Sequence, residues 1–293
     1  MAHAFPKGLL TDAAPLAAWL VLLLVIFVPL ERVCGLRRQG VWRRGFGVDV
    51  AYYFLSGLLP KLVLVFPVSI LAGAIHHFAP ASFYAGMAGL PLAVRMAGAL
   101  VVSDIGSYWG HRLSHQIPLL WRFHAIHHSA EEMDWLVNSR AHPVDLMFTR
   151  LCGLAPMYLL GLAQPMSNSL DLAPMLVMIA GTLWGFFIHA NVNWRLGFVE
   201  QILSTPAFHH WHHTNDGGQY LNKNYAAMLP WVDRLFGTHF LPGQQWPQRY
   251  GTDTEVAPGL GGQLLQPFAG GDRAAAESDG LVQPPSEAAA ANQ

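Results

Sequence analysis

Long apolar stretches without charges alternate along this chain with short segments rich in histidine and arginine. The first stretch covers residues 13–30, which are 18 uncharged residues rich in Leu and Val. A membrane-spanning helix needs about 20 such residues, so the stretch predicts a span near the N-terminus. A basic cluster follows it, whereas a signal peptide carries its positive charge before the apolar core. The order therefore predicts a retained helix with its C-terminal end in the cytoplasm.

Further apolar stretches predict additional spans, at about residues 50–75, 92–108, 151–170 and 172–188. The last two are expected to form a hairpin that turns near residues 164–169. When spans are counted from the basic cluster, every histidine-rich segment emerges on the cytoplasmic side. We therefore predict an all-α, integral-membrane helical bundle of about four to five spans, with a cytoplasmic helical cap.

Composition agrees with a membrane protein and suggests the domain boundaries. Hydrophobic residues make up 53% of the chain and charged residues 12%, whereas an average soluble domain is about 25% charged. The net charge of −1 gives no electrostatic reason to expect a nucleic-acid partner. From about residue 251 the composition shifts to Gly, Ala, Pro, Gln and Ser, which predicts disorder. The predicted organisation is an N-terminal helix and basic loop over 1–48, a main domain over 49–250 and a disordered tail over 251–293.

The histidines follow spacings that place them on helix faces. An H-x3-H motif begins at His111, and two H-x2-H-H motifs begin at His124 and His209. Residues three or four apart lie on one face of a helix, and imidazole is a strong ligand for transition metals. Because the ligands are too many for one ion, we predict a pair of ions. The predicted ligands are nine histidines: His111, His115, His124, His127, His128, His189, His209, His212 and His213.

Carboxylates near these motifs are candidates to orient the ligands, since metal-bound imidazoles usually donate their second N–H to a carboxylate or carbonyl. Asp104 lies seven residues before His111, on the same predicted helix face. We therefore expect Asp104 to orient a histidine of the first motif. Asp145 and Asp233 are similar but weaker candidates.

Three further residues are weaker candidates for the metal site itself. Asn193 lies four residues after His189 and is expected to act directly or through a water. His210 falls at the edge of its helix sector. His142 is either a tenth ligand or part of a helix start, because Pro143 suits the first helical turn.

The spacings alone do not identify the metal. Structural zinc usually has four ligands that often include cysteine, and zinc hydrolases carry H-E-x-x-H, a motif this chain lacks. The Glu-x-x-His pairs of soluble di-iron bundles are also missing. An all-nitrogen set of about nine imidazoles best suits two iron ions that bind O2. Zinc remains possible as a substitute, because the Irving–Williams order favours it over ferrous iron.

The order and context of the motifs resemble the fatty acid hydroxylase/sterol desaturase superfamily of integral-membrane, non-haem di-iron enzymes. The resemblance covers about residues 49–238. This chain departs from the pattern at Asn193, where some members have a second histidine, and at Ala226, where glycine is expected. Residues 104–112, 121–129 and 209–213 resemble the family's three histidine boxes. Residues 189–191 resemble the isolated ligand before the third box, and residues 224–225 and 231–238 resemble the closing segment.

The resemblance implies an oxidoreductase of lipid biosynthesis, in which two iron ions and O2 hydroxylate or desaturate a lipid C–H bond. The substrate is then a sterol-like lipid, a fatty acyl chain, an alkyl-ether lipid or a carotenoid. Electrons are expected from an external donor such as a ferredoxin or a cytochrome b5-type system, because the haem domain fused to some members is absent. Composition favours the bacterial inner membrane. The alternatives are a zinc-dependent membrane hydrolase and a metal-binding or transport protein of the membrane.

Overall fold

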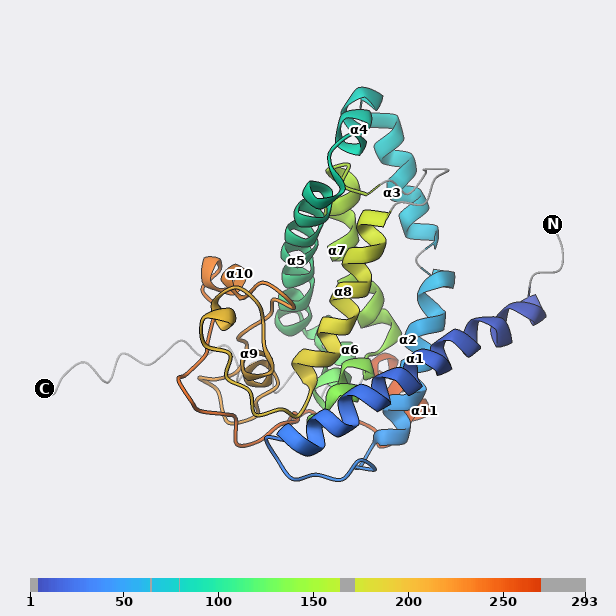
Figure 1. Ribbon diagram of the computed structural model, residues 1–293. Coiled ribbons are helices and arrows are strands. Elements are labelled where there is room, and N and C mark those ends of the chain that lie inside the picture. The colour runs from blue at the N-terminus through green and yellow to red at the C-terminus, as the bar shows by residue number, and fades with distance from the viewer. Residues whose placement is uncertain (1–4, 64, 79, 164–171, 270–293) are drawn as a thin grey trace, which may run out of the picture.

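The computed structural model describes residues 5–63, 65–78, 80–163 and 172–269, and these residues form an all-α fold (Figure 1). Its centre is a bundle in which α5 (Leu92–Gln116) packs against α7 (Pro143–Leu159) and α8 (Leu172–His189). In the described part of the chain, the strand-like pairing is limited to an isolated bridge between Thr214 and Tyr250. The all-α prediction is confirmed.

Helices α5 and α7 approach each other closely because α5 presents glycines to α7. A Cβ atom at Gly106 would overlap the carbonyl oxygen of Cys152, and one at Gly110 would lie 2.9 Å from the Cys152 Cβ. Small residues four apart let helix backbones come together within a membrane. Any larger side chain here would push the helices apart and move the histidines at the C-terminal end of α5.

Two described helices are long and apolar enough to cross a membrane. They are Ala13–Cys34 within α1 (Phe5–Cys34) and the whole of α8. A third span results if α4 (Ala81–Ala88) and α5 are taken as one broken span, although the two helices are bent by 113° at the break between them. The structure thus supports a membrane protein with two to three candidate spans.

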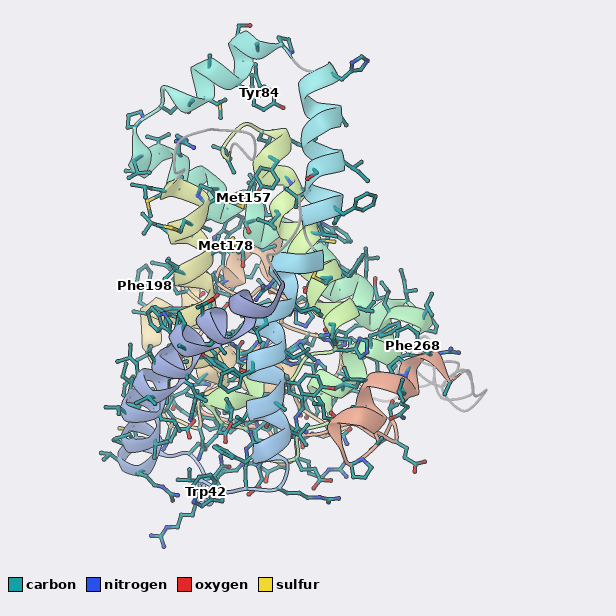
Figure 2. All side chains as sticks on the ribbon, turned by 90° about the vertical axis from the view of Figure 1, so that its right-hand side faces the viewer. Trp42, Tyr84, Met157, Met178, Phe198 and Phe268 are labelled. Atoms are coloured by element: carbon teal, nitrogen blue, oxygen red, sulfur yellow. The ribbon has the colours of Figure 1, made fainter. Side chains whose placement is uncertain are left out.

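The other expected spans are shorter than the sequence suggested. The apolar stretch near residues 50–75 is divided between α2 (Phe46–Val63) and α3 (Val65–Phe78), and α7 has only 17 residues. The turn expected near residues 164–169 lies outside the described residues. Figure 2 shows Trp42, which is 82% exposed, at one end of the molecule and Tyr84 at the other. An exposed tryptophan beside a basic loop is typical of a membrane interface.

Short helices form a cap at one end of the bundle (Figure 1). Proline begins several of these helices. The backbone N–H groups in the first turn of a helix have no acceptor within the helix, so proline, which has no N–H, loses no hydrogen bond there. Thr205 and Asp134 cap two of them by accepting backbone N–H groups with their side chains. The cap consists of α6 (Pro118–His128), the 3-10 helices η1 (Trp135–Ser139) and η2 (Gly197–Gln201), α9 (Pro206–His212) and α10 (Pro230–Leu235).

The predicted disorder from residue 251 is wrong for residues 251–269. This part contains α11 (Leu260–Leu265) and the 3-10 helix η3 (Gln266–Phe268). Gln263 is only 4% exposed, and the ring of Phe268 lies 5.2 Å from that of Phe123, centroid to centroid. Because these contacts reach distant parts of the chain, local composition did not reveal them. Residues 270–293 of the expected tail lie outside the described residues.

Candidate metal centre

All nine predicted histidine ligands lie together in two compact groups, where the cap meets the C-terminal ends of α5 and α8. Within each group the ligand nitrogens are within 4.8 Å of one another. We call them the five-histidine group and the four-histidine group. The five-histidine group is His111, His115, His124, His128 and His212. The four-histidine group is His127, His189, His209 and His213.

Each H-x2-H-H motif contributes to both groups. On α6, His124 and His128 join the five-histidine group while His127 joins the other. On α9 the division is reversed, since His212 alone joins the five-histidine group. The rings of His128 and His213, which belong to different groups, are stacked with centroids 4.5 Å apart. The two groups are therefore direct neighbours, and ions held by them would act on the same space.

In the four-histidine group, hydrogen bonds fix which nitrogen is free to bind a metal. The Nδ1 of His127 donates to the carbonyl of Arg140 at 2.9 Å, and the Nδ1 of His189 donates to the carbonyl of Gly185 at 2.7 Å. A carbonyl only accepts, and burial lowers the pKa of His127 to about 4. The His127 ring is therefore neutral, and in each ring Nε2 is the nitrogen that the carbonyl leaves free. These two Nε2 atoms face each other at 3.4 Å.

The five-histidine group has the same arrangement. The Nδ1 of His111 donates to the carbonyl of Tyr225 at 2.8 Å, and the Nδ1 of His124 donates to the Asp145 carboxylate at 2.9 Å. Their Nε2 atoms then lie 3.1 Å apart. The Nε2 of His212 is buried without a hydrogen-bond partner among the described residues.

The distances between these nitrogens fit the spacing of ligands around a metal ion. Two facing lone pairs repel each other, and buried polar atoms without a partner are costly. Two imidazole nitrogens that bind one ion at ~2.0–2.1 Å lie about 3 Å apart. The Nε2 atoms of His189, His209 and His213 are 3.1–3.2 Å from one another. The donor set therefore suits one transition-metal ion in each group.

A short segment with two left-handed residues orients much of the five-histidine group. Asn222 and Asn224 have φ angles of 58° and 60°, a conformation that asparagine tolerates better than most residues. The pair of asparagines is the sequence signal that could have revealed this segment. The segment supplies three acceptors: Asn222 Oδ1 for His115, the Lys223 carbonyl for His212 and the Tyr225 carbonyl for His111.

Asp104 does not orient a histidine, which corrects the sequence prediction. Its carboxylate accepts the backbone N–H groups of Met228 at 3.0 Å and Leu229 at 2.9 Å. Asp104 thus fixes the loop before α10. Asp145, the weaker candidate, is the carboxylate that bonds a histidine ring, that of His124.

His142 lies at a helix start, outside both groups. Its Nδ1 accepts the N–H of Val144 at 3.1 Å, and its Nε2 donates to the carbonyl of Leu264 at 3.2 Å. With both nitrogens engaged, His142 has none left for a metal. This outcome favours the helix-start alternative that Pro143 suggested.

His210 and Asn193 also lie outside the two groups. The Nε2 of His210 donates to the carbonyl of Ala190 at 3.1 Å, and its Nδ1 accepts from the Tyr250 hydroxyl at 2.7 Å. Asn193 has an exposed side chain, and its backbone N–H donates to the carbonyl of Cys34 at 2.8 Å. Neither arrangement favours direct metal binding.

Replacing Asp145 by asparagine is expected to weaken metal binding at the five-histidine group by about 10–100-fold, the usual effect of losing such a partner. Asparagine removes the charge that strengthens the bond from His124, while its size keeps the packing. Competition with a chelator measures the affinity. Binding that matches the native affinity would show that Asp145 does not support this group.

The fold and the site define an all-α membrane protein that holds a two-part histidine site for metal ions. Residues 96–238 match the family model described as "Fatty acid hydroxylase". This segment carries all nine histidines of the two groups. This segment, slightly less than half of the chain, is thus similar to the fatty acid hydroxylase family.

Several curated proteins are similar to this chain. Ornithine lipid hydroxylase OlsE of Rhizobium tropici is 37% identical over 179 residues, which are 61% of this chain and 51% of that protein. Human alkylglycerol monooxygenase is 34% identical over 136 residues, 46% of this chain and 28% of the relative. A Delta(7)-sterol 5(6)-desaturase of Gibberella zeae is 27% identical over 156 residues, 52% and 43% respectively. The chain thus spans about half or less of these relatives. No solved structure matches it.

Proposed function

We propose that the protein is a membrane-bound di-iron enzyme that uses O2 and external electrons to hydroxylate or desaturate a C–H bond of a lipid. The observation that carries the proposal is the convergence of nine imidazoles in two neighbouring groups whose nitrogens face one another. The match of residues 96–238 to the fatty acid hydroxylase family supports iron as the metal. A ferredoxin or a cytochrome b5-type protein is the expected class of electron donor.

The number of donors favours iron over zinc. Catalytic zinc usually has three protein ligands and structural zinc has four, whereas these groups offer four and five imidazoles. Zinc would still bind as a substitute, because its affinity for nitrogen ligands exceeds that of ferrous iron. The histidines also gather at one end of the bundle, which favours a reaction site over a transport path.

The residues of the site prepare it for oxidation chemistry. When bound, the iron pair would supply the activation of O2. Backbone carbonyls such as those of Arg140 and Tyr225 hold the rings in the tautomer that presents Nε2. The ligands are buried, for example His212 at 3% and His213 at 1% exposure, so the site excludes water that would compete with substrate.

We propose that the substrate is a membrane lipid that enters from the bilayer along the apolar helices above the cap. The relatives named above act, by their names, on ornithine lipids, alkylglycerols and sterols. Those names include both hydroxylation and desaturation, so the proposal keeps both reactions. We place residues 49–250 as the catalytic domain, with four to five spans in a bacterial inner membrane. The basic cluster after α1 supports a position of the site on the cytoplasmic side.

Untargeted lipid mass spectrometry tests the proposal. Membranes of a host that makes the native chain, supplemented with ornithine lipids, alkylglycerols and sterols, are compared with those of a His127→Ala, His212→Ala double variant. We expect a lipid that gains one oxygen atom, or loses two hydrogens, only with the native chain and only under O2. Lipid turnover that needs neither O2 nor a reductant would contradict the proposal and favour a zinc hydrolase.

A further inference from the structure

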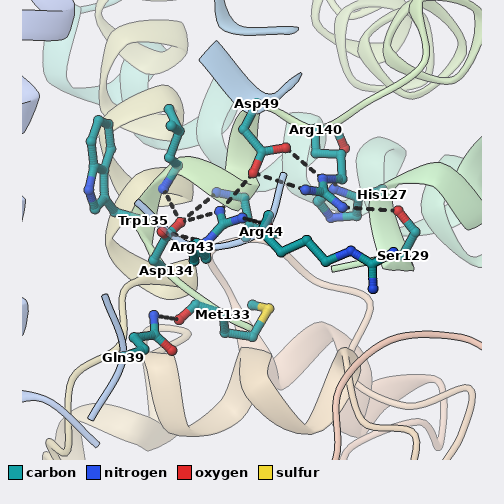
Figure 3. A network of polar contacts seen from close by, with 12 residues as sticks. Gln39, Arg43, Arg44, Asp49, His127, Ser129, Met133, Asp134, Trp135 and Arg140 are labelled. Carbon is teal, nitrogen blue, oxygen red and sulfur yellow. Dashed lines mark hydrogen bonds and ion pairs between the residues drawn. The ribbon is translucent and has the colours of Figure 1, made fainter. Parts of the chain in front are cut away.

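Four charged side chains form a buried network beside the metal site (Figure 3). Arg43, Asp49, Asp134 and Arg140 are each at most 6% exposed. Two positive and two negative charges balance each other, so the network as a whole is neutral. Charged side chains are seldom buried this completely unless they are paired.

The network is continuous and has short contacts. Arg43 donates to both oxygens of the Asp134 carboxylate at 2.6 Å and to Asp49 at 2.7 Å. Arg140 donates to the two oxygens of Asp49 at 2.6 Å and 3.1 Å. Planar guanidinium groups with two contacts to a carboxylate fix geometry as well as charge. The side chain of Arg140 is therefore held in a single orientation.

Arg140 connects this network to a metal ligand. Its carbonyl accepts the Nδ1–H of His127 at 2.9 Å, and its Nη1 donates to the hydroxyl of Ser129 at 3.2 Å. The side chain that Asp49 holds and the carbonyl that accepts from His127 thus belong to the same residue. This links the His127 ring to a carboxylate in α2.

A second set of hydrogen bonds connects the N-terminal segment to the residues that follow another ligand, His189. Glu31 accepts the backbone N–H groups of Trp135 at 2.8 Å and Asn191 at 2.9 Å. The side chain of Asn191 exchanges two hydrogen bonds with the backbone of Arg37, at 2.8 Å and 3.0 Å. Both His127 and His189 belong to the four-histidine group.

The five-histidine group is supported from elsewhere. Its acceptors are the Asp145 carboxylate and the segment of residues 222–225. Residues 31–49 lie outside the segment 96–238 that matches the family model. The two metal groups are thus oriented by different parts of the chain.

We propose that residues 31–49 position the four-histidine group, and that Asp49, acting through Arg140 and its carbonyl, is a positioning residue for the ion held there. Buried ion pairs seldom stabilise a fold more than apolar side chains would, so stability alone does not account for this network, whereas a positioning role does. The inference rests on the proposed function only in requiring that both groups bind metal.

The test counts iron in the full-length protein, purified in detergent and loaded with Fe(II). The native chain is expected to hold two ions and Asp49→Asn one. His213→Ala is expected to remove the ion of the four-histidine group, and His115→Ala the ion of the other. Adding Asp49→Asn should then cause no further loss with His213→Ala and nearly complete loss with His115→Ala. Non-additive effects of this kind identify groups that act together.

The matched control is Arg44→Gln, which removes a neighbouring charge whose side chain is 84% exposed and should leave two ions. Equal loss of both ions in Asp49→Asn, or no loss, would overturn the proposal. If that variant does not fold, Arg140→Lys keeps the charge without the two-point contact and should show the same selective loss. Selective iron loss without lipid oxidation would refute the proposed function alone, and a native chain that binds no metal would refute both.

Discussion

Replacement of His213 by alanine is expected to abolish lipid oxidation and to lower bound iron from two ions to one per chain. His213 is 1% exposed, and its Nε2 lies within 3.2 Å of the Nε2 atoms of His189 and His209. Loss of one nitrogen leaves three histidines in that group. Loss of an outer partner alone already weakens metal binding ~10–100-fold, so loss of a direct ligand should do more.

Iron analysis and product detection by mass spectrometry measure this effect together. His128→Ala should give the same loss of activity but remove the ion of the five-histidine group. His239→Ala is the control, since its ring contacts Arg234 and lies outside both groups. That variant should keep both ions and its activity. Full activity in His213→Ala would refute the assignment of the four-histidine group.

Replacement of Asp233 by alanine is expected to destabilise the protein by about 2–6 kcal/mol, because two buried N–H groups lose their acceptor at ~1–3 kcal/mol each. The carboxylate is fully buried and accepts the N–H groups of Tyr225 at 2.7 Å and Ala226 at 2.8 Å. Since the carbonyl of Tyr225 orients His111, the variant should also lose affinity at the five-histidine group. Thermal unfolding and iron titration measure the two effects.

Asp216→Ala provides a matched comparison. Asp216 also accepts two backbone N–H groups, those of Gln248 and Arg249, but in a solvent-exposed position. Water replaces a lost acceptor there, so the destabilisation should be clearly smaller. If both variants unfold at the same temperature, the burial of the Asp233 hydrogen bonds does not increase their contribution to stability.

The choice of metal-site residues followed from local sequence. Spacings of three and four place side chains on one helix face whatever the rest of the chain does. For this reason the two H-x2-H-H motifs and the H-x3-H motif predicted histidines that the structure brings together. The same local rules predicted the all-α class and offered a helix start at Pro143 as one interpretation of His142.

Prediction of the supporting groups from spacing was less successful. Asp104 shares a helix face with His111, but seven residues separate them by about 10 Å along the axis, which is too far for contact. Shared face was therefore a poor guide to a hydrogen bond. Asp145, which does bond His124, comes from a different helix, and only packing brings α7 beside α6.

The sequence by itself determined that this chain forms apolar helices and a set of histidines suited to metal, because those properties depend on residues a few positions apart. Only the tertiary structure decided that His127 separates from its neighbours His124 and His128 to join a group with residues of α8 and α9. It also decided that backbone carbonyls from remote segments orient the rings. A carbonyl is the same in every residue, so which carbonyl accepts a ring N–H depends on where the chain folds.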